Sequence, residues 1–275
     1  MSHIEQTILE LINHLVRKHP ELSPLIRSII DSSTVDNKST PKFTEMVALY
    51  KTRNDLYNAM NNYFLNEAPD YLRSHRNYFK INNRGFGEDA FHAMWLTLIN
   101  EFKPKNMLEI GIYRGQVITL WGLISKFNEF ISEIHGISPF SSAGDENSAY
   151  IDNLDYLKDT LLSHNYFQLV EPKLLKALST EPVAKAYIKS KSWDLIYIDG
   201  SHDYDVALSD YEISIENLSE GGLLIMDDSS LFTEYKPDNS SFAGHPGPSR
   251  IVTERAMLEL SFLGGVGHNN VFIKK

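Results

Sequence analysis

Short apolar segments alternate with helical patterns through the second half of the chain. The apolar segments, most of them bounded by polar or glycine residues, lie at 107–111, 133–138, 167–170, 193–200 and 221–228. Runs of this length are typical of strands that are buried on both faces. Between them the spacing of apolar residues predicts helices at 115–127, 148–162 and 204–218. Strands that alternate with helices predict an α/β fold, Rossmann-like and doubly wound, with a mostly parallel sheet.

The two ends of the chain depart from this alternation. A helix near 249–260 and a last strand at 270–275 are predicted to close the fold. At the other end, helical spacing is seen at 4–15, at 23–30 and through 43–64, with a polar, turn-forming stretch at 31–41. We therefore expect residues 1–80 to form a helical extension that contributes to a substrate pocket, a lid or a dimer contact. Residues 81–275 are expected to form the domain that holds the sheet.

Composition restricts the class of protein further. The 275 residues include 42% apolar and 23% charged residues, as is typical of globular proteins. The 26 basic against 36 acidic residues give a net charge of −10, which disfavours a nucleic-acid partner. The absence of cysteine excludes disulfides, thiolate metal sites and a cysteine nucleophile. No stretch approaches the roughly 18 apolar residues of a membrane span, so we expect a cytoplasmic protein without a membrane partner.

A glycine-containing turn follows the first predicted strand, with the pattern E-x-G-x-x-x-G from Glu109 to Gly115. Gly111 and Gly115 allow positive φ and close approach of the backbone, and the N–H groups that start the next helix favour an anionic group. A dinucleotide site requires G-x-G-x-x-G, which makes room for a pyrophosphate. The spacing therefore argues against a nicotinamide cofactor, although a plain strand–helix turn would also fit.

Three carboxylates and one imidazole follow the fourth and fifth predicted strands. Asp199 ends WDLIYIDG, and His202 lies three residues later. Asp227 and Asp228 end GGLLIMDD. Because the carboxyl ends of parallel strands meet at one edge of a sheet, these side chains are expected to line one crevice. Carboxylate oxygens are the ligands that Mg²⁺ prefers, whereas helix capping is the alternative role for any one of the aspartates.

The order E-x-G-x-x-x-G, IDGSH at 198–202 and GG-x-x-x-x-DD at 221–228 resembles class I S-adenosylmethionine-dependent methyltransferases. It is similar in particular to the small-molecule O-methyltransferase branch, whose metal-dependent members methylate sugar hydroxyls. The resemblance covers about residues 85–275. It implies cofactor contacts from Glu109, Gly111, Tyr113, Gly115, Ser138 and Asp199. It also implies Mg²⁺ bound by Asp199, Asp227 and Asp228, with His202 as the base and Asp199 beside it in catalysis.

The activity that this resemblance implies is transfer of a methyl group from S-adenosylmethionine to a hydroxyl of a small-molecule acceptor, such as a sugar unit of a natural product. Two alternatives stay open. One is a non-catalytic binding protein with a degenerate methyltransferase fold. The other is a different enzyme that uses Asp199 and His202, although the chain has neither a G-x-S-x-G elbow nor a P-loop. The sequence does not fix the oligomeric state, and a homo-oligomer is compatible with it.

The end of the second predicted strand departs from the family pattern. Such enzymes usually place an acid there to bind the cofactor ribose, whereas this chain has Ser138 in Gly136-Ile137-Ser138-Pro139. Three explanations are open. Ser138 binds the ribose more weakly, Asp145 or Glu171 replaces the acid, or the site no longer binds this cofactor; the first two fit the otherwise intact pattern better.

A few further residues carry weaker signals. The turn from Gly244 to Ser249, which includes His245, is either a lid or a plain connection, and Phe86 is either a cofactor contact or a hinge. Trp95 and Trp121 lie at helical spacing and are expected in the core. No role is assigned to three histidines that show no spacing signal, namely His92, His135 and His268.

Overall fold

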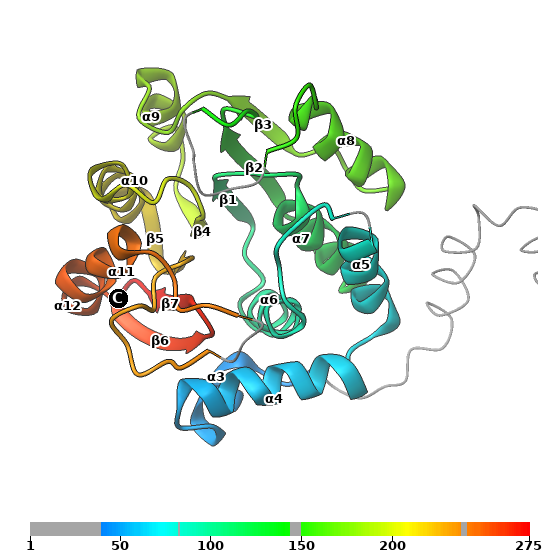
Figure 1. Ribbon diagram of the computed structural model, residues 1–275, viewed down its shortest axis with the longest axis vertical. Coiled ribbons are helices and arrows are strands. Elements are labelled where there is room, and N and C mark those ends of the chain that lie inside the picture. Colours follow the sequence, from blue (N-terminus) through cyan, green and yellow to red (C-terminus); the bar gives the residue numbers. More distant parts are fainter. Residues whose placement is uncertain (1–39, 82, 144–149, 238–240) are drawn as a thin grey trace, which may run out of the picture.

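A seven-stranded sheet forms the centre of the protein in the computed structural model, which describes residues 40–81, 83–143, 150–237 and 241–275 (Figure 1). The strand order is β3-β2-β1-β4-β5-β7-β6. The strands are β1 (Asn106–Ile110), β2 (Glu133–Ser138), β3 (Lys173–Lys176), β4 (Trp193–Ile198), β5 (Leu218–Met226), β6 (Ser261–Val266) and β7 (Asn269–Ile273). The first five strands are parallel, and β7 pairs antiparallel with β5 and β6. The predicted doubly wound α/β fold is confirmed.

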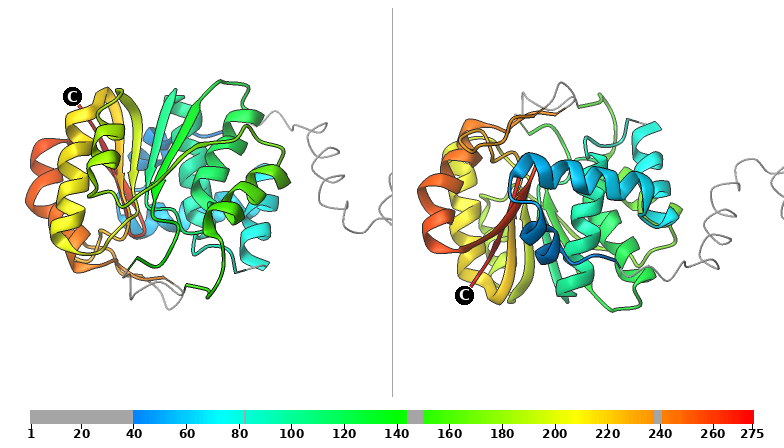
Figure 2. Two further views of the ribbon diagram at one scale, coloured as in Figure 1. Left: turned by 90° about the horizontal axis from the view of Figure 1, so that it is seen from above. Right: turned by 90° about the horizontal axis from the view of Figure 1, so that it is seen from below.

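Helices cover both faces of the sheet, as the two views of Figure 2 show. One face carries α3 (Phe43–Leu49), α4 (Arg53–Asn66), α5 (Asp70–Ile81), α6 (Asp89–Phe102), α7 (Gln116–Phe127) and α8 (Tyr156–Tyr166). The other face carries α9 (Pro182–Ile188), α10 (Tyr204–Asn217), α11 (Pro246–Ile251), the π-helix η2 (Val252–Ala256) and α12 (Met257–Glu259). No helix among these described segments is long and apolar enough to cross a membrane.

Alternate residues of the central strands point to two separate cores. In β4, Leu195 and Tyr197 belong to the core beneath α6 and α7, whereas Ile196 and Ile198 belong to the core beneath α10 and α11. Because side chains alternate along a strand, a strand covered on both faces must be apolar at every position. This requirement is the reason that the strands appear in the sequence as continuous apolar runs.

The two tryptophans that the sequence predicts in the core are buried there. Trp95 of α6 and Trp121 of α7 meet edge to face with ring centroids 5.2 Å apart. Trp95 also meets Tyr197 of β4 at 5.0 Å. The three rings fix the two helices against the sheet face that leads to the end of β4, since aromatic pairs of this geometry contribute about 1 kcal/mol each beyond burial.

The described part of the predicted extension packs on this same core. Phe43, Met60 and Leu72 are fully buried in the cluster that contains the sheet residues. The buried guanidinium of Arg53 donates to the carbonyl of Asn269 (3.3 Å) and to Asn270 Oδ1 (2.8 Å), which joins α4 to the β6–β7 hairpin. Residues 40–81 therefore share one core with the sheet. The boundary at residue 80 stays a prediction, and the helices predicted at 4–15 and 23–30 lie outside the described residues.

The strand predicted at 167–170 is wrong. Helix α8 begins at Tyr156 after the Asp155 cap, later than the predicted start, and Phe167 follows its last residue. The Leu169 amide then bonds to the carbonyl of His164 (3.0 Å), so this apolar run forms the turn that ends the helix. The third strand of the sheet is β3, which begins at Lys173, three residues after the apolar run ends. A four-residue apolar run is too short for its pattern to separate a strand from a helix end.

Strand β6 was missed, because Gly264 and Gly265 interrupt its apolar pattern. These glycines lie against Phe43 of α3 and Arg53 of α4, where side chains would not fit. The helix expected at 249–260 begins at Pro246 and includes a π-helical turn. The pattern through 43–64 divides into α3 and α4 around Lys51. In each case a tertiary contact or a short break changed the element that the local pattern suggested.

Several histidines lie inside the fold rather than at a functional edge. His75 of α5 and His92 of α6 are buried with Nδ1 and Nε2 3.1 Å apart. Burial lowers the pKa of His92 to about 3 and that of His75 well below its ordinary value. Burial likewise lowers the pKa of His164 to about 4. The fold therefore holds these imidazoles in their neutral form.

We expect acid to destabilise the protein through these groups. These histidines take up protons near pH 6.5 in the unfolded chain but stay neutral at that pH in the folded chain. Their contribution to the free energy of unfolding is therefore complete above pH 6.5 and is lost as the pH falls toward 4. Within this range, each such histidine lowers the free energy of unfolding by about 1.4 kcal/mol for each unit by which the pH falls. Urea denaturation between pH 7 and 4.5 measures this slope. The variant His92→Gln should show a shallower slope by about one proton, and an unchanged slope would contradict the assignment.

Candidate active site

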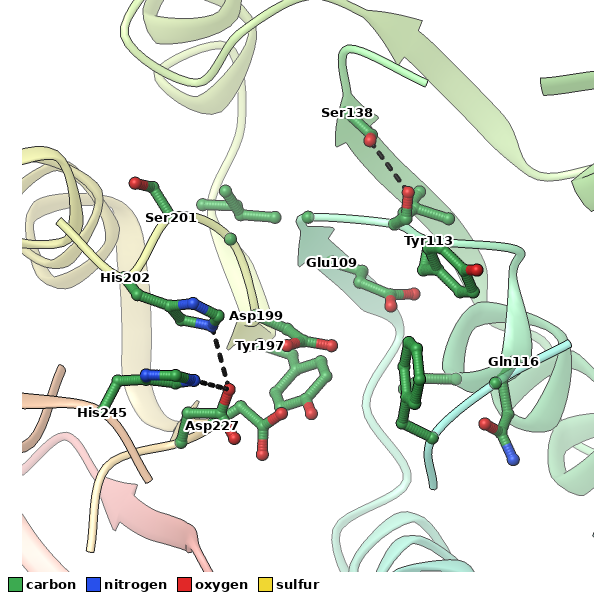
Figure 3. Close-up of a pocket in the computed structure, with 18 of the residues that line it drawn as sticks. Glu109, Tyr113, Gln116, Ser138, Tyr197, Asp199, Ser201, His202, Asp227 and His245 are labelled. Atoms are coloured by element: carbon green, nitrogen blue, oxygen red, sulfur yellow. Dashed lines mark hydrogen bonds and ion pairs between the residues drawn. The ribbon is translucent and has the colours of Figure 1, made fainter. Parts of the chain in front are cut away.

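A large cleft lies where β1, β4 and β5 end, with a volume of about 1290 Å³ (Figure 3). Its walls come from the loop before α6, the turn after β1, the loops after β2, β4 and β5, and the β6–β7 hairpin. Ligand sites usually occupy about 300–1,000 Å³, so the cleft has room for two ligands side by side. Its position at the carboxyl ends of the strands is where open α/β sheets bind ligands.

The turn after β1 is built on glycine. Gly111 has φ of +96° and Gly115, which begins α7, has φ of +80°. A Cβ added to Gly111 would overlap the carbonyl oxygen of Asp199 at the end of β4. The amide of Asp199 in turn bonds to the carbonyl of Ile110 (2.8 Å). Only glycine permits both this φ and this approach, so the turn and the end of β4 form one rigid wall.

A buried ion-pair network holds the turn from behind. Arg114 Nε donates to Asp159 Oδ2 of α8 (2.7 Å), and Arg84 Nη2 donates to Asp159 Oδ1 (2.6 Å). Arg114 also donates to the carbonyl of Asn83 (3.2 Å), which places the loop before α6 beside the turn. Removing one partner of such a buried set typically costs about 3–5 kcal/mol. The sequence interpretation did not identify this network.

The loop before α6 brings aromatic and amide groups to the cleft. Gln116 Oε1 accepts the amide of Gly87 (3.0 Å), while its buried Nε2 has no partner within the described structure. The Phe86 ring lies 5.1 Å from the Tyr113 ring and is 68% exposed. The structure thus places Phe86 at the mouth of the cleft next to Tyr113.

Carboxyl groups line the floor of the cleft. Glu109 is buried at the end of β1, and its Oε2 has no hydrogen-bond partner among the described residues. Burial, with a smaller effect of Asp227, raises its pKa well above the ordinary range. Burial and the neighbouring Asp227 and Asp228 raise the pKa of Asp199 well above its ordinary value. Perturbed carboxyls that face a cleft are typical of functional sites, and a cationic ligand would be stabilised here.

Asp228 is contacted by three histidines. His202 Nε2 lies 2.9 Å from its Oδ2, and His245 Nε2 lies 3.9 Å from the same oxygen. Figure 3 shows the labelled His202 and His245 side by side on one wall of the cleft. His268 Nδ1 lies 3.0 Å from Asp228 Oδ1. Burial would raise the pKa of Asp228, but the bonds from His202 and His268 outweigh it and hold the pKa below the ordinary value.

The structure brings most predicted site residues together. The cleft is lined by Glu109, Gly111, Tyr113, Ser138, Asp199, His202, Asp227 and Asp228. Gly115 is not part of the lining, because it packs against Thr160 of α8, where a Cβ would have no room. Within the set, the neighbouring Asp227 helps to raise the pKa of Asp199, whereas Asp228 pairs with His202 at 2.9 Å. The roles assigned to these residues stay predictions.

Ser138 uses its hydroxyl within its own loop. Its Oγ donates to the carbonyl of Ile112 (3.0 Å) and accepts the amide of Phe140 (3.3 Å). This hydroxyl joins the end of β2 to the glycine turn. Glu171 is exposed and precedes β3, which puts it at the opposite edge of the sheet from the cleft. Asp145 lies outside the described residues.

His268 is the site residue that the sequence interpretation missed. It lies in the β6–β7 hairpin after Gly267, which has φ of +58°. Because β7 runs antiparallel to β5, its first residues reach the same edge of the sheet as Asp227 and Asp228. The Phe91 ring stacks on the His268 ring at 4.6 Å. A prediction of β6 would have revealed the β6–β7 hairpin in the sequence. The hairpin would then have placed His268 at the edge of the sheet that carries Asp227 and Asp228.

Comparison with known proteins fits this geometry. Residues 108–229 match the family model described as a methyltransferase domain. An uncharacterized protein of Acanthamoeba polyphaga mimivirus is 23% identical over 141 residues, which are 50% of this chain and 58% of that protein. The chain thus matches little more than half of the length of this curated relative.

Solved structures share the fold at low sequence identity. A methyltransferase of Podospora anserina, solved with S-adenosylhomocysteine bound, superposes with a TM-score of 0.55 at 14% identity over 82% of this chain and 97% of that one. A structure titled as a putative caffeoyl-CoA O-methyltransferase from Staphylococcus aureus gives 0.54 at 14% identity over 79% and 98%. An O-methyltransferase of Bacillus cereus gives 0.52 at 13% identity over 78% and 97%. These solved methyltransferases share the fold of this chain, and the match to the methyltransferase-domain model covers its central part, residues 108–229.

The close approach at Gly111 gives a test of the site's rigidity. Gly111→Ala should lower the free energy of unfolding by about 4 kcal/mol, because backbone strain adds to overlap with Asp199. Gly221→Ala is the matched control, since Gly221 also has positive φ (+75°) but has no atom within 4 Å of an added Cβ. It should cost about 1 kcal/mol in the same urea titration. Equal losses would show that the contact with Asp199 is unimportant.

Proposed function

We propose that the protein transfers the methyl group of S-adenosylmethionine to a hydroxyl of a small-molecule acceptor, with a sugar unit of a natural product as the expected class. The observation that carries this proposal is the placement of the glycine turn at 109–115 and the His202–Asp228 pair on facing walls of one cleft. The methyltransferase-domain match and the fold support it. A cytoplasmic location and the absence of a nucleic-acid partner remain predictions from composition.

The wall formed by β1 and α7 fits the cofactor. Gly111 lines the cleft, and the buried Oε2 of Glu109 and Nε2 of Gln116 are polar atoms without partners in the described structure. Glu109, Asp199 and Asp227 make the floor acidic, which suits the positive charges of a sulfonium and an ammonium group. Bound S-adenosylmethionine would supply an activated methyl group whose bond to sulfur breaks as a bond to the acceptor oxygen forms.

His202 is suited to remove the acceptor proton. Its Nε2 faces Asp228 Oδ2 at 2.9 Å, so this nitrogen donates and the lone pair resides on Nδ1. Asp228 stabilises the imidazolium that forms when Nδ1 accepts the hydroxyl proton. His268 on the other oxygen of Asp228 fixes the carboxylate in this orientation. The side chain of His202 is 18% exposed, as expected for a group that must reach a ligand in the cleft.

We further propose that a bound Mg²⁺ ion assists the methyl transfer. Asp199, Asp227 and Asp228 are oxygen donors from two adjacent strand ends, and the buried Asp227 Oδ1 lacks a hydrogen bond among the described residues. Carboxylate oxygens are the donors that a hard divalent cation prefers, and such an ion would stabilise negative charge on the acceptor oxygen. Among the described residues, the groups whose ligand atoms lie within 4.8 Å of one another include Asp227 and Asp228 but not Asp199. Asp199 would then serve both the cation and the cofactor side of the cleft.

Binding and turnover test the proposal separately. Calorimetry should detect S-adenosylhomocysteine binding to the purified chain, and mass spectrometry should detect methylated product from a panel of sugars and phenols. A protein that binds the cofactor product but methylates no acceptor would favour the non-catalytic alternative. Absence of binding would contradict the proposal as a whole.

His202→Gln should reduce kcat about 10²- to 10⁴-fold, because the variant keeps the size of the side chain but cannot accept the proton. Affinity for S-adenosylhomocysteine should stay within about twofold, since His202 lies on the wall opposite the glycine turn. Ser201→Ala, which changes the exposed neighbour, is the matched control and should retain activity. Undiminished turnover in His202→Gln would exclude His202 as the base.

A further inference from the structure

We propose that His202, His245 and Asp228 form a binding site for one divalent transition-metal ion, distinct from the all-oxygen site at the three aspartates. One ligand atom from each residue lies within 4.8 Å of the other two. The His202 and His245 rings stack nearly parallel, with centroids 3.8 Å apart and an angle of 18° between their planes. Both Nε2 atoms face Asp228 Oδ2, so small side-chain rotations would bring three donors to the roughly 2.0–2.2 Å that such ions require.

The backbone around these residues holds the three donors in place. The amide of His245 bonds to the carbonyl of Asp228 (2.7 Å), and a bridge pairs Ser229 with Gly244. Gly244, with φ of +114°, lies so close that an added Cβ would overlap the Asp228 carbonyl. A Cβ added to Gly247 would overlap the His202 carbonyl in the same way. The loop that carries His245 therefore docks directly on the backbone of the other two residues.

The carboxylate of Asp228 is also constrained. Asp228 has φ of +49°, a strained conformation for a non-glycine residue that tends to occur at functional sites. Its second oxygen, Oδ1, lies 3.0 Å from His268 Nδ1. A partner that orients a ligating carboxylate from its far side is a regular feature of metal sites. Asp228 Oδ2 is thus directed toward the two imidazoles.

The donor set selects the class of ion. Two imidazoles and one carboxylate suit borderline ions such as Zn²⁺, Co²⁺, Fe²⁺ and Mn²⁺, whereas Mg²⁺ prefers oxygen donors and retains its waters. The side chains of His202, His245 and Asp228 are 18%, 28% and 13% exposed, respectively, and all three line the cleft. Open positions on the ion would therefore face the space for the acceptor, as in catalytic sites with three protein ligands.

This inference concerns the same cleft as the proposed methyl transfer but does not depend on it. With an ion bound, His202 would act as a ligand rather than as the proton acceptor. The two roles therefore predict different metal requirements, and metal binding can be measured without turnover.

Cobalt binding tests the site directly. Untagged protein, stripped with a chelator, should bind one equivalent of Co²⁺ with a visible d–d absorption band and should bind Mg²⁺ without dependence on His245. His245→Ala should weaken Co²⁺ binding at least about 100-fold and abolish the band, since loss of a ligand exceeds the about 10- to 100-fold cost of losing an outer partner. His202→Gln should have the same effect, so the test does not rest on one variant.

Two controls separate this site from its alternatives. His135→Gln removes a buried histidine of β2 that does not line the cleft, and Asp199→Asn alters the all-oxygen set but none of the three proposed ligands. Both should keep Co²⁺ affinity within about threefold, and circular dichroism should show that each variant is folded. Co²⁺ binding that is absent, or equally strong in His245→Ala and His202→Gln, would overturn the inference. Retained S-adenosylhomocysteine binding in that case would leave the proposed function standing.

Discussion

The close approach of the Gly111 backbone to the Asp199 carbonyl determines the geometry of the whole site. It joins the turn after β1 to the end of β4, so that the glycine turn and the carboxylate of Asp199 belong to the same wall. The Arg114–Asp159–Arg84 network supports this wall from α8, and Ser138 ties the end of β2 to it. A site with so little backbone freedom can align two reactants, which is the main requirement of transfer from an already activated methyl donor.

The opposite wall is organised around one carboxylate. Asp228 accepts contacts from His202, His245 and His268, which belong to three different loops that meet only in the folded chain. The same arrangement suits both the proposed base and the proposed ion site. An ion bound at His202 Nε2 would leave the imidazole proton on Nδ1, so Nδ1 could no longer accept the proton of the acceptor hydroxyl.

The residues at 40–81 support the cleft from outside its lining. They share the core beneath α6 and α7, and Arg53 fixes α4 to the hairpin that carries His268. The hairpin in turn presents His268 to Asp228, so packing far from the cleft sets the orientation of the carboxylate. The loop between α5 and α6 adds Phe86 and the Gly87 contact with Gln116 at the mouth.

The sequence by itself determined the parallel sheet and the main strand-end residues. A strand covered on both faces must be apolar throughout, so the strands could be recognised as apolar runs. Ligands in such sheets bind at the carboxyl ends of the strands. The sequence therefore predicted that the strand-end residues share one cleft, namely Glu109, Asp199, Asp227 and His202. The tertiary structure alone showed that β6 exists, that His268 and His245 reach Asp228, and that the Ser138 hydroxyl is used within its own loop. These features depend on contacts between residues far apart in the chain, such as Arg53 with the β6–β7 hairpin. A local hydrophobic pattern carries no information about such contacts.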